Sequence, residues 1–125
     1  MKRTLFAVPA IATLVLLSSA AIGQTAPTKN ADGILVTATG MTLYTFDKDA
    51  GGSGKSNCNG PCATIWPPLF AVSVQTAAPY SVVMRDDGAR QLAYNGKPLY
   101  LYAADKKPGD RSGDNVKEVW HVVKD

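Results

Sequence analysis

Few residues of this chain are suited to binding a transition metal, because its 125 residues include one histidine and two cysteines. A structural zinc site takes four ligands, which is more than this set readily supplies. The composition also lacks any strong bias, with 46% hydrophobic and 18% charged residues. This balance excludes the disordered, collagen-like and coiled-coil classes and predicts one globular domain.

A large excess of charge is absent too, since 13 Lys and Arg residues face 10 Asp and Glu residues. Two of the basic residues, Lys2 and Arg3, lie at the N-terminus, and the only other adjacent basic pair is Lys106 and Lys107. Nucleic-acid binding depends on clustered basic side chains that displace counterions. We therefore expect no nucleic-acid partner.

No apolar run is long enough to cross a bilayer comfortably. The run over residues 5–17 falls short of the roughly 20 residues that a spanning helix needs, and Pro9 interrupts it. It follows a basic start and precedes small residues, which is the pattern of a secretory signal peptide. We expect cleavage after Gly23, with Ala20 and Ala26 as alternative sites, and a flexible tail over residues 24–30. The mature protein would be periplasmic or secreted, without stable membrane insertion.

The two cysteines, Cys58 and Cys62, are four positions apart in a chain expected to reach an oxidising compartment. Cysteines there usually form disulfides, and a bond between these two would fix the shape of a glycine-rich loop. A redox-active pair is an alternative, although thioredoxin-like sites have two intervening residues rather than three. A metal site that adds His121 is a further alternative.

Residues 40–49 and 96–105 form an internal duplication, in which Gly, Leu, Tyr and Asp recur 56 residues apart. An Asp-Gly pair precedes each copy, and a tryptophan after a β-branched residue follows it, at Trp66 and at Trp120. We expect a single β-domain made of two repeats, which cover about 31–70 and 80–125 of the range 31–125.

Each repeat is predicted to hold a β-hairpin, a long loop and a closing strand, since no window outside the leader shows a sustained helical period. The strongest turn signal is Asn95-Gly96, because both residues tolerate the positive φ of a type I′ turn. We expect an all-β fold, either a small barrel or a sandwich. The predicted strands cover residues 34–39, 41–46, 80–85, 90–94 and 97–102.

Aromatic residues alternate along the repeated strands. A period of two places Tyr44 with Phe46 on one face, and Tyr100 with Tyr102 on the equivalent face, with leucines opposite. Because both faces are apolar, these strands are expected to be central, with the rings and the two tryptophans packed in the core. A ligand-stacking role for the rings is the alternative.

Acidic residues end the repeated strands, at Asp49 and Asp105. Asp47 and Asp49 open a loop with oxygen ligands at alternate positions, as calcium loops do, but Cys58 occupies the place of the twelfth-position glutamate. Asp47, Asp49 and His121 are therefore only weak candidates for metal ligands. The favoured interpretation is that Asp49 and Asp105 accept hydrogen bonds from loop amides or from tryptophan indole groups.

The sequence shows no recognisable catalytic constellation. It has no Gly-x-Ser-x-Gly elbow, and no Cys–His pairing survives if Cys58 is oxidised. His121 shares a strand face with Val119 and Val123, which favours a packed histidine over a general base. We expect no enzymatic activity and no cofactor.

Several ordered motifs resemble a bacterial family of secreted repeats of unknown function, described as predicted lipoproteins with a Yx(FWY)xxD motif. The resemblance implies export and a tandem repeat, and little chemistry. Many relatives are lipoproteins, whereas no cysteine directly follows the expected cleavage site here, and the second repeat lacks the cysteine pair. The motifs lie at residues 44–49, 56–63, 66–69, 95–100, 105–110 and 120–123.

These observations predict an exported, noncatalytic β-domain that binds an envelope component or a small ligand through the loops after its repeats. The alternative is a periplasmic metal-handling or redox accessory protein. It would use Cys58, Cys62 and His121, with Met41 or Met84 as further sulfur ligands.

Overall fold

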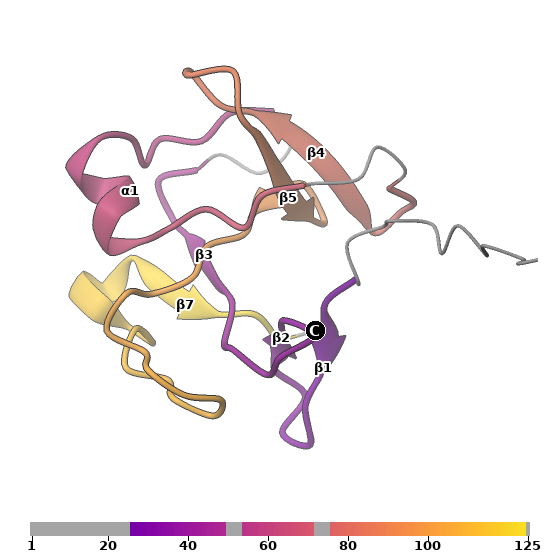
Figure 1. Ribbon diagram of the computed structural model, residues 1–125, viewed down its shortest axis with the longest axis vertical. Helices are drawn as coiled ribbons and strands as arrows, with labels where there is room; N and C mark the ends of the chain where they lie inside the picture. Colours follow the sequence, from indigo (N-terminus) through magenta and orange to yellow (C-terminus); the bar gives the residue numbers. More distant parts are fainter. Residues whose placement is uncertain (1–25, 50–53, 72–75, 125) are drawn as a thin grey trace, which may run out of the picture.

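The computed structural model describes residues 26–49, 54–71 and 76–124. The expected signal peptide lies outside the described residues. Short strands dominate the described part, with one helix of five residues and one 3-10 turn, η1 (Figure 1). In chain order the elements are β1 Thr28–Lys29, β2 Leu35–Val36, β3 Tyr44–Phe46, α1 Pro61–Ile65, β4 Tyr80–Met84, β5 Arg90–Tyr94, β6 Lys97–Pro98, η1 Val116–Glu118 and β7 Trp120–Val122.

The hairpin of the second repeat forms at the predicted turn. Asn95 and Gly96 have φ of 50° and 80°, the left-handed values that the Asn-Gly pair permits. Strand β5 covers the predicted residues 90–94 and pairs antiparallel with β4 on one side and β6 on the other. The predicted hairpin is confirmed, although β6 ends at Pro98 instead of running to residue 102.

The hairpin of the first repeat is more irregular than predicted. Its strands shrink to β2 and β3, and the turn between them is closed by hydrogen bonds from Thr37 N to Met41 O (2.8 Å) and from Gly40 N to Thr37 O (2.9 Å). Gly40 has φ of 87°, and a Cβ there would lie 3.0 Å from Pro108. A glycine is therefore needed at this turn for both its conformation and its lack of a side chain.

The segment expected to be a flexible tail up to residue 30 is ordered from β1 onward. Asn30 explains this difference, because its side-chain oxygen accepts hydrogen bonds from the backbone N–H groups of Asp32 and Ile34. Such an Asx turn reverses the chain and lets β1 pair with β2. This turn-forming role of Asn30 was not predicted from the sequence.

The two repeats exchange their closing segments. Strand β7, from the end of the second repeat, pairs with β3 of the first repeat. In return, Pro68 of the first repeat bridges to Tyr100 of the second, and Leu69 N donates to Leu99 O (3.0 Å). At the centre, Tyr44 and Tyr100 exchange two backbone hydrogen bonds of 2.8 and 2.9 Å. A pseudo-two-fold axis therefore passes between these tyrosines, and each repeat is completed by the other.

The two faces of the central strands bury two different clusters, as the alternation predicts. One face contributes to an aliphatic cluster, and the opposite face contributes to an aromatic one. The aliphatic cluster contains Leu35, Leu43, Leu92, Tyr94, Leu99 and Val123. The aromatic cluster contains Tyr44, Cys58, Trp66, Tyr100 and Trp120.

The fold class is all-β with two tandem repeats, and the sheets of the described residues are small, antiparallel and open. Each holds two or three strands, so the expected barrel or sandwich is not confirmed. Helix α1 was not predicted, because five residues are too few to show a helical period. It begins at Pro61, whose fixed φ suits the first helical position, and Pro67 follows its end.

Candidate functional site

The tyrosine and aspartate of the repeated motif pair across the two repeats. Tyr44 Oη donates to Asp105 Oδ2 at 2.5 Å, and Tyr100 Oη donates to Asp49 Oδ2 at 2.5 Å. Both tyrosines are fully buried, and both aspartates are nearly so. The buried tyrosine hydroxyl of each repeat therefore finds its hydrogen-bond acceptor in the aspartate of the other repeat. This pairing gives the tyrosine and the aspartate a structural role.

The second carboxylate oxygen of each aspartate accepts a loop amide. Asn57 N donates to Asp49 Oδ1 at 2.6 Å, and Ser112 N donates to Asp105 Oδ1 at 2.9 Å. The structure thus contains the expected bonds from loop amides, but the other donor is a tyrosine hydroxyl instead of a tryptophan indole. Because both oxygens of Asp49 are occupied, it is poorly placed to join Asp47 in binding a cation.

Burial shifts the acid–base properties of these groups. It raises the pKa of Asp49, while hydrogen bonds from Tyr100 and Asn57 and the charge of Arg85 act in the opposite direction. Burial also raises the pKa of Tyr44 and of Tyr100 well above the usual value for a phenol, and the hydrogen bond to an aspartate adds to the effect. Both hydroxyls therefore stay protonated in the folded protein at any physiological pH.

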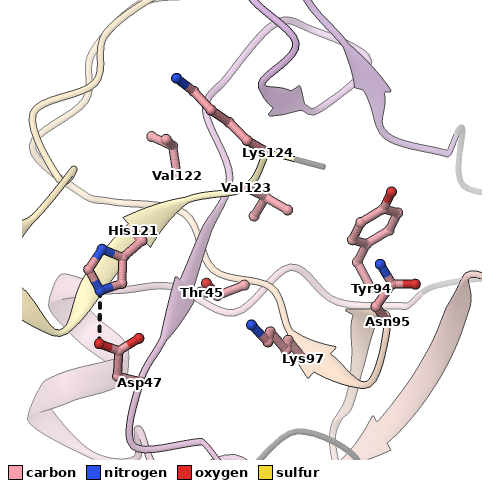
Figure 2. Close-up of a pocket in the computed structure, with 9 residues that line it drawn as sticks. All are labelled: Thr45, Asp47, Tyr94, Asn95, Lys97, His121, Val122, Val123 and Lys124. Atoms are coloured by element: carbon pink, nitrogen blue, oxygen red, sulfur yellow. Dashed lines mark hydrogen bonds and ion pairs between the residues drawn. The ribbon is translucent and has the colours of Figure 1, made fainter.

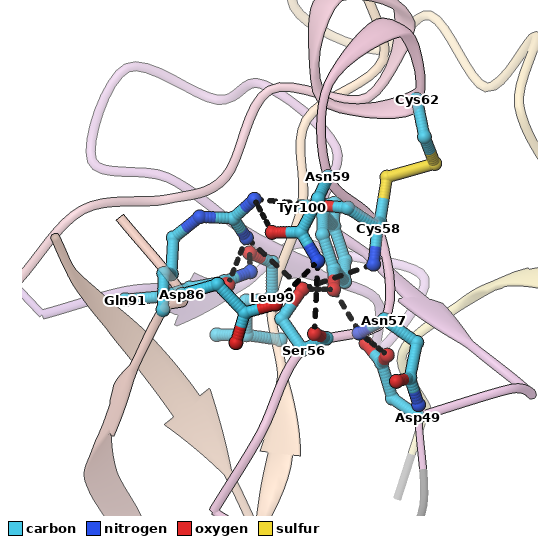
Figure 3. Close-up of a disulfide and its surroundings, with 11 residues drawn as sticks. Asp49, Ser56, Asn57, Cys58, Asn59, Cys62, Asp86, Gln91, Leu99 and Tyr100 are labelled. Atoms are coloured by element: carbon cyan, nitrogen blue, oxygen red, sulfur yellow. Dashed lines mark hydrogen bonds between the residues drawn. A yellow bond between two sulfur atoms is a disulfide. The ribbon is translucent and has the colours of Figure 1, made fainter. Parts of the chain in front are cut away.

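A buried arginine extends the polar network beside the disulfide. Figure 3 shows Ser56, Tyr100 and Asp49 of this network next to Cys58. Arg85 is 5% exposed and donates to Ser56 Oγ (3.0 Å), Gln91 Oε1 (2.7 Å) and Cys58 O (2.5 Å). Ser56 Oγ lies 2.6 Å from Tyr100 Oη, so a chain of polar contacts links the arginine to Asp49. The role of Arg85 was not predicted from the sequence, where the available signal is a basic residue directly after a mostly apolar strand.

The structure places Cys58 and Cys62 at disulfide-bonding distance, with the sulfur atoms 2.07 Å apart. Cys58 is fully buried, and the bridge joins the loop before α1 to its second residue. Disulfide-bonded cysteines offer no thiolate pair to a metal ion. His121 lines a pocket that neither cysteine lines. The described residues contain no group of three or more His, Cys, Asp or Glu side chains that could hold a metal ion.

Four aromatic rings of the two repeats form one continuous stack. Trp66 and Trp120 lie at its centre, with ring centroids 3.8 Å apart and planes 3° from parallel. Phe46 stacks on Trp120 (4.2 Å) and Tyr102 stacks on Trp66 (4.1 Å), so each motif ring covers the tryptophan of the other repeat. Tyr44 and Tyr100 contact the stack edge-on. Tyr44, Tyr100 and the two tryptophans are buried in the core, whereas Phe46 and Tyr102 are partly buried.

A groove of about 420 Å³ runs along this stack. All four stacked rings line it, with apolar side chains from α1 and from the loop that contains η1. Figure 1 shows α1 and the turn before β7 on the same side of the molecule. Both segments belong to the loops that follow the repeated strands. The lining residues are Phe46, Lys48, Cys62, Ile65, Trp66, Tyr102, Val116, Lys117, Val119 and Trp120.

A second, smaller pocket of about 240 Å³ contains the histidine (Figure 2). His121 Nε2 lies 2.8 Å from Asp47 Oδ2, and both side chains are partly exposed. The lining is mixed and includes Lys97 and Lys124 beside Val122 and Val123. The sequence predicted a packed edge histidine, whereas His121 is partly exposed and has a polar partner. Thr45 lies opposite His121 across the β3–β7 pair, and Asp47 follows two residues later, just after β3.

Comparison with known proteins gives one match. A family profile described as a secreted repeat of unknown function matches residues 27–70 and 81–124, one match for each repeat. No curated protein and no solved structure matches the chain. In the part of the chain that the structure describes, no helix has the length and apolar character needed to span a membrane.

Proposed function

Because the chain belongs to the family of secreted repeats of unknown function, we propose that it is an exported, noncatalytic domain that binds a small molecule in the groove along its ring stack. It would act in the periplasm or outside the cell after loss of a signal peptide near Gly23. The observation that carries this proposal is the groove itself, a concave, mostly apolar site built from both repeats.

The dimensions and lining of the groove support a small ligand over an envelope protein. Its volume of about 420 Å³ lies within the range of about 300–1,000 Å³ that is usual for small-molecule sites. Its walls are hydrophobic and aromatic, as such sites usually are. The exposed side chain of Ile65, with 52% of its surface accessible, forms part of one wall and offers apolar area that a ligand would cover.

The groove is also supported by a rigid base. Trp66 and Trp120 are 4% and 3% exposed, and each is fixed by rings on both faces and by a tyrosine at its edge. A site whose walls are held by the protein core loses little conformational entropy when a ligand binds. The ring stack would therefore both stabilise the fold and shape the binding surface.

The position of the buried titratable groups supports binding over catalysis. Asp49, Tyr100 and Arg85 use their polar atoms on one another or on neighbouring loops, and none of them lines the groove. A general acid or base must reach the substrate within hydrogen-bonding distance. These groups would thus stabilise the loops around the groove instead of reacting with a bound molecule.

The uncharged fluorescent probe N-phenyl-1-naphthylamine tests the proposal. We expect its emission to rise on binding, tryptophan emission to fall, and the Ile65→Ser variant to bind it several-fold more weakly because one apolar wall is lost. Met84→Ser is the matched control, since Met84 is equally exposed (55%) and does not line the groove. Absence of probe binding, or equal binding by the wild type and Ile65→Ser, would reject the groove as a ligand site.

A further inference from the structure

We propose that the groove selects an aromatic acid, a flat ring system that carries a carboxylate or sulfonate group. This inference rests on the proposed function and adds the chemical class of the ligand. Two observations support it: the positive charges that line the groove, and the ring edges by which the two tryptophans reach it.

The charged side chains among the lining residues are both cationic. Lys48 comes from the segment after β3 in the first repeat, and Lys117 comes from η1 in the second. Both are exposed, and neither forms an ion pair with a described residue. Among the residues that the structure describes, no acidic side chain lines the groove. A ligand with a negative charge would therefore complement the groove.

The carboxylates nearest to these lysines in sequence do not occupy the groove. Asp47 lies against His121 in the other pocket, and Asp49 is buried under Tyr100. Glu118 follows Lys117 but is not among the lining residues. The fold therefore leaves the charges of Lys48 and Lys117 available to a ligand, although acidic residues are close to both lysines in the sequence.

The two tryptophans of the ring stack add to the positive character of the groove. Trp66 and Trp120 have both faces covered by neighbouring rings, so they can reach the groove only with their edges. The edge of an aromatic ring is electropositive, whereas its face is electronegative. Ring edges therefore attract an anion, and they also make favourable edge-to-face contacts with the flat surface of an aromatic ligand.

The turn that presents Lys117 is held in a strained conformation. Lys117 and Glu118 have φ of 48° and 59°, and Asn115 has φ of 64°, a left-handed region that residues with a side chain rarely adopt. Hydrogen bonds from Asn115 N to Trp120 O (2.6 Å) and from Val119 N to Val116 O (3.1 Å) keep the turn in place. Such strain persists where surrounding structure fixes it, and it often marks ligand-binding loops.

A pair of matched probes tests this inference. The anionic probe 1-anilinonaphthalene-8-sulfonate differs from N-phenyl-1-naphthylamine by its sulfonate group, so their affinities isolate the contribution of charge. We expect the anionic probe to bind about five- to tenfold more tightly at low salt, and this preference to shrink at high salt because the lysines are exposed.

Substitution of the two lysines tests whether they cause the preference for the anionic probe. Lys48→Gln and Lys117→Gln should each weaken binding of the anionic probe about two- to fourfold, and the double variant should bind both probes equally. Lys97→Gln is the matched control, since Lys97 is an exposed lysine that lines the other pocket. Unchanged circular dichroism and melting temperature would show that the variants remain folded.

The results also separate failure of this inference from failure of the proposed function. If both probes bind with equal affinity, or if Lys97→Gln alone weakens the anionic probe, the groove binds ligands without selecting anions and the inference is wrong. If dodecanoate displaces the anionic probe better than 1-naphthoate does, the ligand is an aliphatic acid instead of an aromatic one. If neither probe binds, the groove itself is rejected.

Discussion

The hydroxyl groups of Tyr44 and Tyr100 are the residue-scale feature that connects the two repeats. Tyr44→Phe or Tyr100→Phe removes a donor and leaves a buried aspartate oxygen without its partner, which costs about 1–3 kcal/mol of unfolding free energy. Urea denaturation measures this loss. Tyr102→Phe is the control, because the Tyr102 hydroxyl bonds to no described residue, and its stability should match the wild type. Equal stability of all three variants would show that the pairing contributes nothing.

The same two hydroxyls predict a loss of stability in alkali. Burial raises the folded-state pKa of both phenols above the unfolded value near 10. Their stabilisation is therefore complete below about pH 10 and is lost as the pH rises through the folded-state pKa, because only the unfolded chain releases the protons. Denaturation midpoints measured between pH 8 and 11.5 should fall steeply at the upper end.

The control for this pH dependence is the double variant Tyr44→Phe with Tyr100→Phe. It lacks both phenols, so the free energy of unfolding should decline less steeply above pH 10 than in the wild type. Parallel curves for the two proteins would show that the decline comes from other groups and would contradict the assignment.

The segment before η1 packs directly against the aromatic cluster at Gly113. A Cβ at this position would lie 2.8 Å from the Trp66 ring and 2.9 Å from the Tyr44 ring, closer than packed atoms tolerate. Gly113→Ala should therefore destabilise the protein by about 1–3 kcal/mol, as overpacking of a core does. Ser112→Ala is the neighbouring control and should change the melting temperature little, because Ser112 is exposed and uses only its backbone N–H. An unchanged melting temperature for Gly113→Ala would contradict the close packing.

The loop that contains α1 depends on the bridge between Cys58 and Cys62. Freshly purified protein should show no free thiol in a denaturing thiol assay. Replacing both cysteines by serine should lower the free energy of unfolding by about 2 kcal/mol, the chain-entropy value for so short a loop. Two reactive thiols, or an unchanged denaturation midpoint in the double variant, would argue against this role.

Sequence patterns predict local elements well in this chain and their partners poorly. Strand β5 and the Asn95-Gly96 turn follow from alternation and turn chemistry, which act over a few residues. The pairing of β7 with β3 does not follow, because a strand pattern is the same whichever repeat supplies the neighbour. The groove lysines were also missed, since Lys48 and Lys117 are far apart in sequence and meet only through this exchange.

At the scale of the whole molecule, the duplication produces one structure with shared elements in place of two independent domains. The closing segments cross over, the tyrosines meet at the pseudo-two-fold axis, and the ring stack alternates between repeats. A segment the length of residues 26–124 can bury only one modest core. Sharing strands between the repeats lets side chains of both copies pack in this core, and side chains of both copies line the groove.

A double-mutant cycle tests this interdependence most directly. Tyr44→Phe and Asp105→Asn are measured singly and together by urea denaturation, and Tyr44→Phe is then combined with Asp49→Asn, the aspartate of its own repeat. Since Tyr44 bonds to Asp105 at 2.5 Å, the cross-repeat pair should show a coupling of about 1 kcal/mol or more, whereas the pair within one repeat should be additive to within about 0.5 kcal/mol. Coupling within the repeat, with additivity across repeats, would contradict the account.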